Sequence, residues 1–429
     1  MEKKNLIIVF DHPLSLRSYL ETGILAEINK TYNLLICTIG KLDYEIKRIA
    51  DQYFRFEVIL LSSLEKFMLG FYANCYWWRV ADNSLSIQNR TWYQKKNKGN
   101  FIQANKLAKV YSYIFSQPPI KVSNYLLRGT LNKIESLIEN YNQDKILYIT
   151  SGGTTSIADQ LVNYFSKFPV NVYCIVENWD NVSSKAVFAH PAKITGVWGE
   201  QSKTFAKKIH NFDDGQVFQI GNPRVEWLQK NVRKVESPQG IFFGGGSVDF
   251  IQESIFLLAT LDIAEKFNIQ VFYLPHPKCY DQARDFVSTI NSKNLLCIGN
   301  FYIESHQGIA ALPNLDTYLY PFNNAKIFVS SFSTLNLEAA ILGIPSIAID
   351  LHTNLNLNKN RISDRHDHIK DILDKNIFHV VNNLDDFRKI VIELISTSQS
   401  KQIIDYQELY YLVNMNYEYI EKFKYFLSY

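Results

Sequence analysis

Short apolar runs alternate with stretches of helical spacing along the first half of the chain. Residues 6–10 and 34–39 form continuous apolar runs, and residues 15–30 between them have the spacing of a helix. Runs of this length are typical of buried strands, so the pattern predicts a β-α-β opening. The same alternation returns at residues 145–150, 158–165 and 170–176. It indicates a parallel sheet whose strands are joined by crossover helices.

A second series of the same kind follows a polar stretch at residues 231–239. It predicts strands at 240–243, 269–274, 325–329 and 346–350, and helices at 252–266 and 335–342. We therefore expect an α/β protein with two Rossmann-like, doubly wound parallel-sheet domains facing a cleft. The predicted domains are 1–233, with an aromatic-rich helical insertion at about 64–143, and 234–400. Residues 401–429 are predicted to form a helical tail.

Composition narrows the class of protein. The 429 residues include 45 Lys and Arg against 42 Asp and Glu, a net charge of +3, which argues against a nucleic-acid partner. Five scattered cysteines fit neither a disulfide framework nor a zinc site and indicate a reducing, cytoplasmic setting. The sequence shows no signal peptide and no apolar stretch of roughly 18 residues, so any membrane contact is expected to be peripheral, at the inner face.

Three turns follow predicted strands of the second half. The first is Gly244-Gly245-Gly246-Ser247, where glycines let a ligand approach and helix N–H groups favour a phosphate. The second is His276-Pro277, whose imidazole can donate to a phosphate oxygen. The third is Ser330-Ser331-Phe332-Ser333-Thr334, with Glu338 one turn into the next helix. Each is alone explicable as an ordinary turn or N-cap, but together they fall where open α/β sheets bind ligands.

The first half carries candidate bases and acceptor-side residues at its strand ends. Carboxylates and a histidine there could deprotonate an acceptor hydroxyl, as a group transfer requires. The candidate bases are Asp11, His12, Glu177 and Asp180. The candidate acceptor-side residues are Gly152, Gly153, Thr154, Asn178, Trp179 and Asn181. Any of them could equally be a capping or turn residue.

Two further segments have alternative interpretations. Residues 67–98 combine Trp77 and Trp78 with Lys95, Lys96 and Lys98, which suits either a membrane-surface patch or a buried aromatic layer beside a solvated loop. The residues Arg365, His366 and His368 could suggest a metal site, but a polar loop of this kind is more often solvated. No metal site is predicted.

Several pieces of the chain resemble GT-B glycosyltransferases of bacterial surface-polysaccharide synthesis. The resemblance covers about residues 145–350 and rests on Glu177-Asn178-Trp179-Asp180-Asn181, Trp198-Gly199-Glu200, Gly221-Asn222-Pro223-Arg224, His276-Pro277, Ser330-Ser331, Glu338-Ala339-Ala340 and Gly343-Ile344-Pro345. The His-Pro and Ser-Ser pairing is similar to that of sialyltransferases, Kdo transferases and CDP-glycerol glycerophosphotransferases. The chain departs from them at Leu274-Pro275, where a basic residue often stands, and this leaves the donor open.

The resemblance implies a metal-independent transferase with no cofactor. It would take a sugar from a nucleotide-sugar donor to a saccharide or lipid-linked acceptor, with Glu338 near the ribose or base. The residues implied to contact the donor phosphate are Gly245, Gly246, His276, Ser330, Ser331 and Ser333. A polyol-phosphate transferase of the CDP-glycerol type and a silent partner subunit remain alternatives. A UDP-N-acetylglucosamine 2-epimerase is another, although Asp11-His12-Pro13-Leu14 stands where its Gly-Thr-Arg-Pro-Glu is expected.

Overall fold

The protein is described here by a computed structural model. The structure describes residues 3–40, 54–94, 100–141, 145–154, 156–233, 235–236, 238–246, 250–298, 314–351, 361–397 and 406–429. The chain forms two compact units. The first is Met1–Pro223 together with Tyr410–Tyr429, and the second is Arg224–Leu409.

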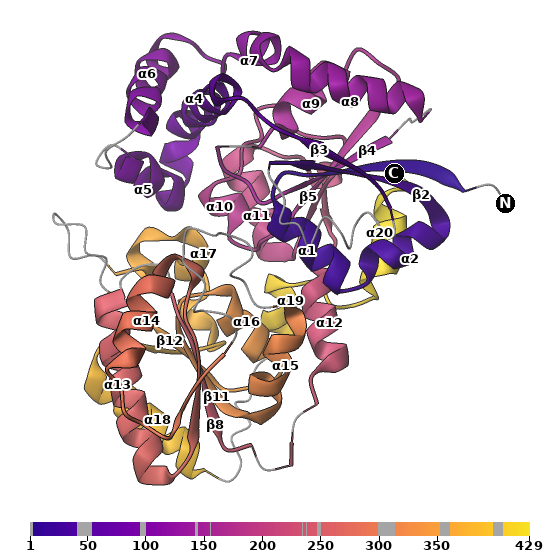
Figure 1. Ribbon diagram of the computed structural model, residues 1–429. Coiled ribbons are helices and arrows are strands. Elements are labelled where there is room, and N and C mark those ends of the chain that lie inside the picture. The colour runs from indigo at the N-terminus through magenta and orange to yellow at the C-terminus, as the bar shows by residue number, and fades with distance from the viewer. Residues whose placement is uncertain are drawn as a thin grey trace. The chain divides into compact units, whose positions relative to one another are not determined.

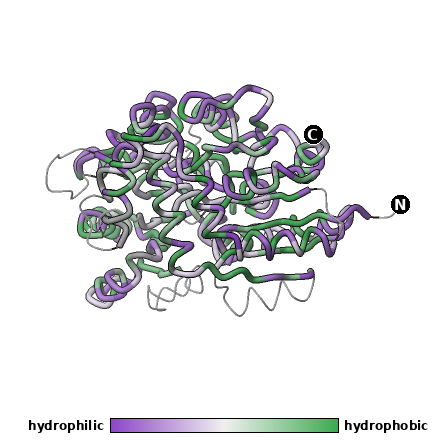
Figure 2. The backbone as a smooth tube through the Cα atoms, turned by 90° about the horizontal axis from the view of Figure 1, so that it is seen from above, coloured by the Kyte–Doolittle hydropathy of each residue, from purple (hydrophilic) through white to green (hydrophobic). Residues whose placement is uncertain are grey.

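The first unit is built on a parallel sheet of seven strands in the order β3-β2-β1-β4-β5-β6-β7 (Figure 1). The strands are β1 (Lys4–Phe10), β2 (Tyr32–Ile39), β3 (Arg55–Ile59), β4 (Lys145–Thr150), β5 (Asn171–Val176), β6 (Thr195–Val197) and β7 (Val217–Gln219). The tube of β1 turns from hydrophilic to hydrophobic after its first residues in Figure 2, and Leu6 to Phe10 are buried. Continuous apolar strands are expected where helices cover both faces of a sheet.

Helices connect these strands. They are α1 (Pro13–Glu21), α2 (Ile24–Thr31), α9 (Ala158–Phe165), α10 (Asn181–Ser184), α11 (Glu200–His210) and α12 (Pro223–Asn231), with α12 leading into the second unit. The prediction of one helix over 15–30 is wrong, because the chain breaks between α1 and α2. Gly23 takes a φ of 75° there, a left-handed conformation that glycine adopts without a Cβ clash.

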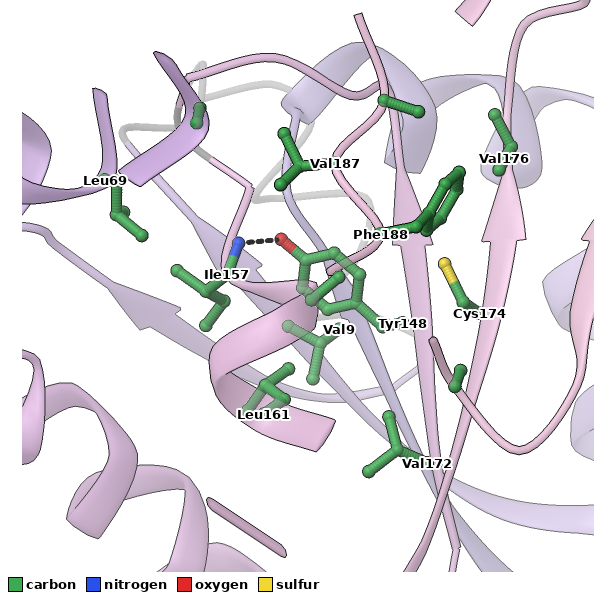
Figure 3. Packing of buried hydrophobic residues seen from close by; sticks show 14 of the residues in the cluster. Val9, Leu69, Tyr148, Ile157, Leu161, Val172, Cys174, Val176, Val187 and Phe188 are labelled. Carbon is green, nitrogen blue, oxygen red and sulfur yellow. Dashed lines mark hydrogen bonds between the residues drawn. The ribbon is translucent and has the colours of Figure 1, made fainter. Parts of the chain in front are cut away.

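The core of this sheet includes a buried tyrosine with a paired hydroxyl. Tyr148 of β4 lies among Val9, Leu161 and Phe188, and its Oη accepts the N–H of Ile157 at 2.9 Å (Figure 3). The bond pairs a backbone N–H at the start of α9 with the phenol oxygen. Because the buried hydroxyl has this partner, its burial does not leave an unpaired polar group in the core.

A layer of helices lies between β3 and β4 in the sequence. It consists of α4 (Ser63–Val80), α5 (Leu85–Gln94), α6 (Asn100–Ile114), α7 (Ile120–Leu126) and α8 (Arg128–Asn140). Polar bonds tie this layer to the sheet unit. Tyr72 Oη of α4 donates to Asp159 Oδ2 at 3.0 Å, and the Oη of Tyr76 lies 2.6 Å from Nδ1 of His210.

Asp159 is a buried acid whose ionisation opposes folding. Burial raises its pKa from 3.8 to about 7, although the bonds from Tyr72 and Ala189 favour the carboxylate. Between these values the folded protein binds more protons than the unfolded chain, so the free energy of unfolding falls as pH rises. In Asp159→Asn this dependence is absent. We expect the variant's stability relative to wild type to grow across this range by on the order of 4 kcal/mol, then level off.

Denaturant unfolding of both proteins at several pH values measures this difference. Any loss of stability caused by the new, unpaired amide is independent of pH and changes the stability difference between the two proteins by a constant amount. Burial of the Asp159 charge instead makes that difference change with pH. A difference that stays constant from about pH 4 to 7 would contradict the buried-charge explanation.

The second unit holds a parallel sheet of six strands in the order β10-β9-β8-β11-β12-β13. The strands are β8 (Gly240–Gly244), β9 (Gln270–Leu274), β10 (Leu295–Cys297), β11 (Ala325–Ser331), β12 (Ser346–Ile349) and β13 (His379–Val381). The helices are α13 (Phe250–Phe267), α14 (Tyr280–Ser288), α15 (Leu315–Asn324), α16 (Thr334–Ile341), α17 (Asp367–Lys370) and α18 (Leu384–Ser396). The predicted pair of doubly wound, parallel-sheet α/β domains is therefore confirmed.

The C-terminal helices α19 (Tyr406–Leu412) and α20 (Tyr419–Phe426) bring the chain back to the first unit. Asn414 N–H donates to the Trp198 carbonyl at 2.7 Å, and the hydroxyls of Tyr19 and Tyr419 lie 2.5 Å apart. A Cβ on Gly199 would lie 2.6 Å from the backbone of Leu412. Residues 410–429 are thus an integral layer of this unit.

Candidate functional site

Strand order reverses at one place in each sheet, between β1 and β4 in the first unit and between β8 and β11 in the second. Open α/β sheets bind ligands outside the carboxyl ends of their strands at such a switch point. In the first unit Asp11 and His12 follow β1, and Ser151 follows β4. In the second unit Gly245 follows β8, and β11 ends at Ser331.

Asp11 joins the ends of β1 and β4. Its Oδ2 accepts the Thr150 hydroxyl at 2.5 Å and its Oδ1 accepts the Ser151 N–H at 2.8 Å. Burial raises the pKa of this carboxyl to about 6, although both bonds favour the charged form. Since both oxygens already accept hydrogen bonds within the protein, Asp11 is suited to holding the turn after β4.

His12 is half-buried at the same end of β1. Burial lowers its pKa below the ordinary 6.5, and the positive charge of Lys185 lowers it further. The imidazole is therefore neutral at neutral pH, which is the state in which a histidine can accept a proton.

Glu177 follows β5 and is held from several sides. Its Oε2 accepts the Ser15 hydroxyl, while its backbone carbonyl accepts the Trp198 indole N–H and, at 3.2 Å, the Asn222 amide. Trp198 and Asn222 belong to two motifs that the sequence resemblance noted separately. The structure thus brings the three motifs together in the first unit.

The remaining predicted acceptor-side residues shape the turns after β4 and β5. Gly152 and Gly153 have φ values of 72° and 103°, and Gly153 N–H donates to the Lys185 carbonyl at 3.0 Å. Trp179 and Asn181 are buried, and neither Asn181 side-chain polar atom has a hydrogen-bond partner.

Two residues of this group sit at the edges of these turns. Thr154 is half-buried, and the Asn178 carbonyl accepts the Asn181 N–H at 3.2 Å. Asp180 caps α10 and accepts the Ser184 hydroxyl at 3.3 Å.

The glycine turn of the second unit packs directly against the other two predicted segments. A Cβ on Gly245 would lie 2.6 Å from the backbone nitrogen of His276, and one on Gly246 would lie 1.8 Å from Ser331 Oγ. Only glycine permits this approach, so the structure brings the glycine turn, the His-Pro pair and the Ser-Ser pair together. Gly244 is the last residue of β8, and Ser247 lies outside the described residues.

A buried acid that the sequence analysis missed also contacts this turn. Glu253, in the first turn of α13, is 1% exposed and accepts the Gly246 N–H. Gly245 N–H donates to the Leu274 carbonyl at 2.7 Å. Both glycine N–H groups are therefore engaged within the protein. The sequence signal was weak, because an acid in the first turn of a helix normally complements the helix dipole.

The start of α16 lies beside the glycine turn. Ser333 is the N-cap of α16 and forms a capping box with Asn336, and Thr334 is the first helical residue. Ser330 is buried, with its hydroxyl 3.2 Å from that of Ser333. His276, Ser333 and Thr334 are half-buried, and Pro277 starts the short turn of 3-10 helix after His276. The first turn of a helix leaves N–H groups without intrahelical partners.

Glu338 forms a buried ion pair. Its Oε1 lies 2.7 Å from Arg224 Nε, and the Arg224 guanidinium lies 4.6 Å from the centre of the Tyr318 ring. Burial raises the pKa of Glu338, whereas Arg224 lowers it. Its predicted place near the ribose or base stays a prediction. The pair joins two motifs of the sequence, Gly221-Asn222-Pro223-Arg224 and Glu338-Ala339-Ala340.

Of the two alternatives for residues 67–98, Trp77 agrees with the buried aromatic layer, because it is fully buried and its indole N–H donates to the Ala186 carbonyl at 3.2 Å. Lys95, Lys96 and Lys98 lie outside the described residues, so contact of this segment with a membrane stays a prediction. The expectation of a solvated loop around Arg365 is wrong. The segment with Arg365 and His368 is buried rather than solvated, because Asp350 accepts both the N–H and the hydroxyl of Ser363 and holds the segment over β12.

The structure also resembles solved proteins over nearly its whole length. A UDP-GlcNAc 2-epimerase of Methanocaldococcus jannaschii in complex with UDP-GlcNAc and UDP matches with a TM-score of 0.55 at 12% identity over 99% of both chains. UGT89C1 of Arabidopsis thaliana complexed with quercetin matches with a TM-score of 0.57 at 10% identity, again over 99% of both.

A UDP-GlcNAc 2-epimerase of Neisseria meningitidis bound to UDP-GlcNAc has a TM-score of 0.54 at 11% identity over 99% of both chains. No protein-family model matches the chain, and no curated protein matches it in sequence. The likeness therefore defines the fold, and the chain has the GT-B fold that the sequence resemblance implied.

Proposed function

We propose that the protein is a glycosyltransferase that uses a nucleotide-sugar donor. The observation that carries the proposal is the convergence of Gly245, Gly246, His276 and Ser331 at the switch point of the second sheet. Of the three solved proteins compared above, two are UDP-GlcNAc epimerases whose structures hold UDP-GlcNAc, and the third is a plant protein bound to quercetin. These likenesses support a nucleotide-sugar ligand for this chain.

The donor phosphate would contact the half-buried residues beside the glycine turn. His276 and the N-terminal turn of α16, with Ser333 and Thr334, can supply hydrogen bonds and a favourable helix dipole. Gly245, Gly246, Ser330 and Ser331 would support this surface, since both glycine N–H groups and the Ser330 hydroxyl are engaged within the protein. The leaving phosphate is then stabilised by protein groups, and we expect binding to be independent of magnesium.

His12 is the proposed general base among the four candidates. Its neutral imidazole accepts the proton of an acceptor hydroxyl as that oxygen bonds to the anomeric carbon, and the bond from that carbon to the donor phosphate breaks. The electron pair of the broken bond leaves with the nucleotide. Asp11, with both oxygens engaged, acts as a positioning residue for the turn after β4.

The proposed acceptor is a saccharide or lipid-linked hydroxyl of cell-surface polysaccharide synthesis. This follows the resemblance to sialyltransferases, Kdo transferases and CDP-glycerol glycerophosphotransferases. Because of the resemblance to the last of these families, transfer of a polyol phosphate is the alternative reaction. The acceptor class is tested with defined saccharide and lipid-linked acceptors.

The second candidate is a UDP-N-acetylglucosamine 2-epimerase, which the fold of the archaeal and Neisseria proteins favours. Incubation with nucleotide sugars separates the two, because a transferase releases free nucleotide only when acceptor is present. An epimerase instead changes the sugar without an acceptor, which nuclear magnetic resonance detects at the ring protons. Epimerisation without acceptor would overturn the transferase proposal. If neither product is detected, the result would favour a silent partner subunit.

A further inference from the structure

An exposed apolar surface covers the end of the helical layer, formed by α6, α7 and the turn between them. We refer to it as the α6–α7 face. Tyr113 is 94% exposed and Tyr125 is 73% exposed, and large apolar neighbours on both helices and in the turn between them are exposed as well. These neighbours are Leu107, Val110, Ile114, Phe115 and Val122. In Figure 1 α6 lies at the upper left of this layer and α7 at its top. A concentration of large exposed apolar side chains of this kind marks an interaction site.

The face is presented on an ordered scaffold. Leu107, Val110 and Ile114 recur at the spacing of one helix side, while Asn105 and Ala108 on the opposite side of α6 are buried. Arg79 of α4 donates to the Phe115 carbonyl at 3.1 Å, and the ring of Tyr111 packs 4.6 Å from that of Phe115. The apolar side chains therefore project from a helix whose other side is fixed to α4.

The charge of the surrounding sequence is of one sign. Residues 83–134 contain nine Lys and Arg residues and no Asp or Glu. The rest of the chain holds 36 Lys and Arg, the total of 45 less these nine, against all 42 acidic residues. An anionic surface would therefore attract this part of the molecule and repel the remainder. Exposed Lys106, Lys121 and Arg128 lie on or next to the α6–α7 face.

We propose that the α6–α7 face docks the protein onto an anionic lipid bilayer. Tyrosines and aliphatic side chains flanked by lysines suit the interface of such a membrane, where rings lie at the headgroup level and cations meet lipid phosphates. A second copy of the chain suits the face poorly, because a two-fold contact would oppose two basic surfaces. Among the described residues, no helix is long and apolar enough to span a bilayer, so the contact is peripheral. This proposal goes beyond the transfer reaction and does not depend on it.

Cosedimentation with vesicles of phosphatidylcholine, with and without phosphatidylglycerol, tests the proposal on the full chain. We expect binding only when phosphatidylglycerol is present. The triple variant Lys106→Gln, Lys121→Gln, Arg128→Gln is expected to lower the partition coefficient about a hundredfold, roughly fivefold per charge. The double variant Tyr113→Ser, Ile114→Ser is expected to lower it at least about tenfold.

Control variants carry changes of the same kind on the second unit. The exposed residues Lys266, Lys293 and Lys389 are replaced by glutamine, and Leu258 by serine, and both controls are expected to bind as wild type does. Absence of binding to phosphatidylglycerol vesicles would overturn the proposal. An equal loss of vesicle binding in the controls would also overturn it. Full binding by the Tyr113 and Ile114 variant would overturn it as well, because binding would then come from a general polyanion site. A concentration-dependent dimer abolished in that variant would instead assign the face to a second copy.

Discussion

Replacement of His12 by alanine is expected to lower kcat by about a hundredfold to ten-thousandfold, the usual contribution of a general base. Donor binding should be unchanged, because the residues proposed to bind the donor belong to the second unit. Burial and Lys185 hold the pKa of His12 below 6.5, so wild-type kcat/KM should be constant above that pH and fall as His12 is protonated below it. Steady-state kinetics across pH measure both effects.

His190 provides a matched control for this variant. It is a half-buried histidine of the same unit whose pKa is also lowered by burial, but it follows no strand at the switch point. His190→Ala should keep the wild-type kcat and pH profile. A His12→Ala enzyme with unchanged kcat would move the base to Glu177 or Asp180. An acid limb above neutral pH would also exclude a buried imidazole as the titrating group.

Replacement of Gly245 by alanine should weaken nucleotide binding about tenfold to a hundredfold. The new methyl group would lie 2.6 Å from the His276 nitrogen and 2.9 Å from Pro275 Cα, both backbone atoms that cannot rotate away. The His-Pro segment must therefore shift, and a displaced imidazole loses a hydrogen bond to the phosphate. Overpacking of this kind also costs about 1–3 kcal/mol of stability. Calorimetric titration and denaturant unfolding separate the two losses.

Gly215→Ala is the control, since a Cβ there meets nothing within 4 Å and it should bind nucleotide as wild type does. If Gly245→Ala does not fold, His276→Ala removes the imidazole without crowding the turn. Its binding should fall by a similar factor. Wild-type affinity in both folded variants would place the donor phosphate away from this turn.

The strands could be predicted from sequence because their environment dictates their composition. Strands such as β1, β4, β8 and β11 are covered on both faces and read as unbroken apolar runs. The three turns of the second unit were found because glycine, His-Pro and a serine cluster each directly follow a strand. Their meeting at one switch point depends on the strand order, which local patterns do not encode.

Other features depended on contacts between distant residues. Glu253 reads as an ordinary helix-start acid, and only packing reveals that it accepts the Gly246 N–H. Arg224 and Glu338 stand in separate motifs, and their ion pair spans 114 positions. Aromatic composition did not distinguish buried Trp77 from exposed Tyr113, because both lie on helices rich in apolar residues. Whether an aromatic side chain of this layer is buried or exposed depends on which side of α6 packs on α4.

Calorimetric titration of the protein with CMP, CDP, UDP and GDP, with and without magnesium, tests the central claim most directly. A ligand that binds only the native state is also detected as a rise in thermal stability. The proposal predicts that one of these nucleotides binds without magnesium and that His276→Ala weakens it about tenfold or more. Binding of none of them, or binding that His276→Ala leaves unchanged, would contradict a donor site at the glycine turn.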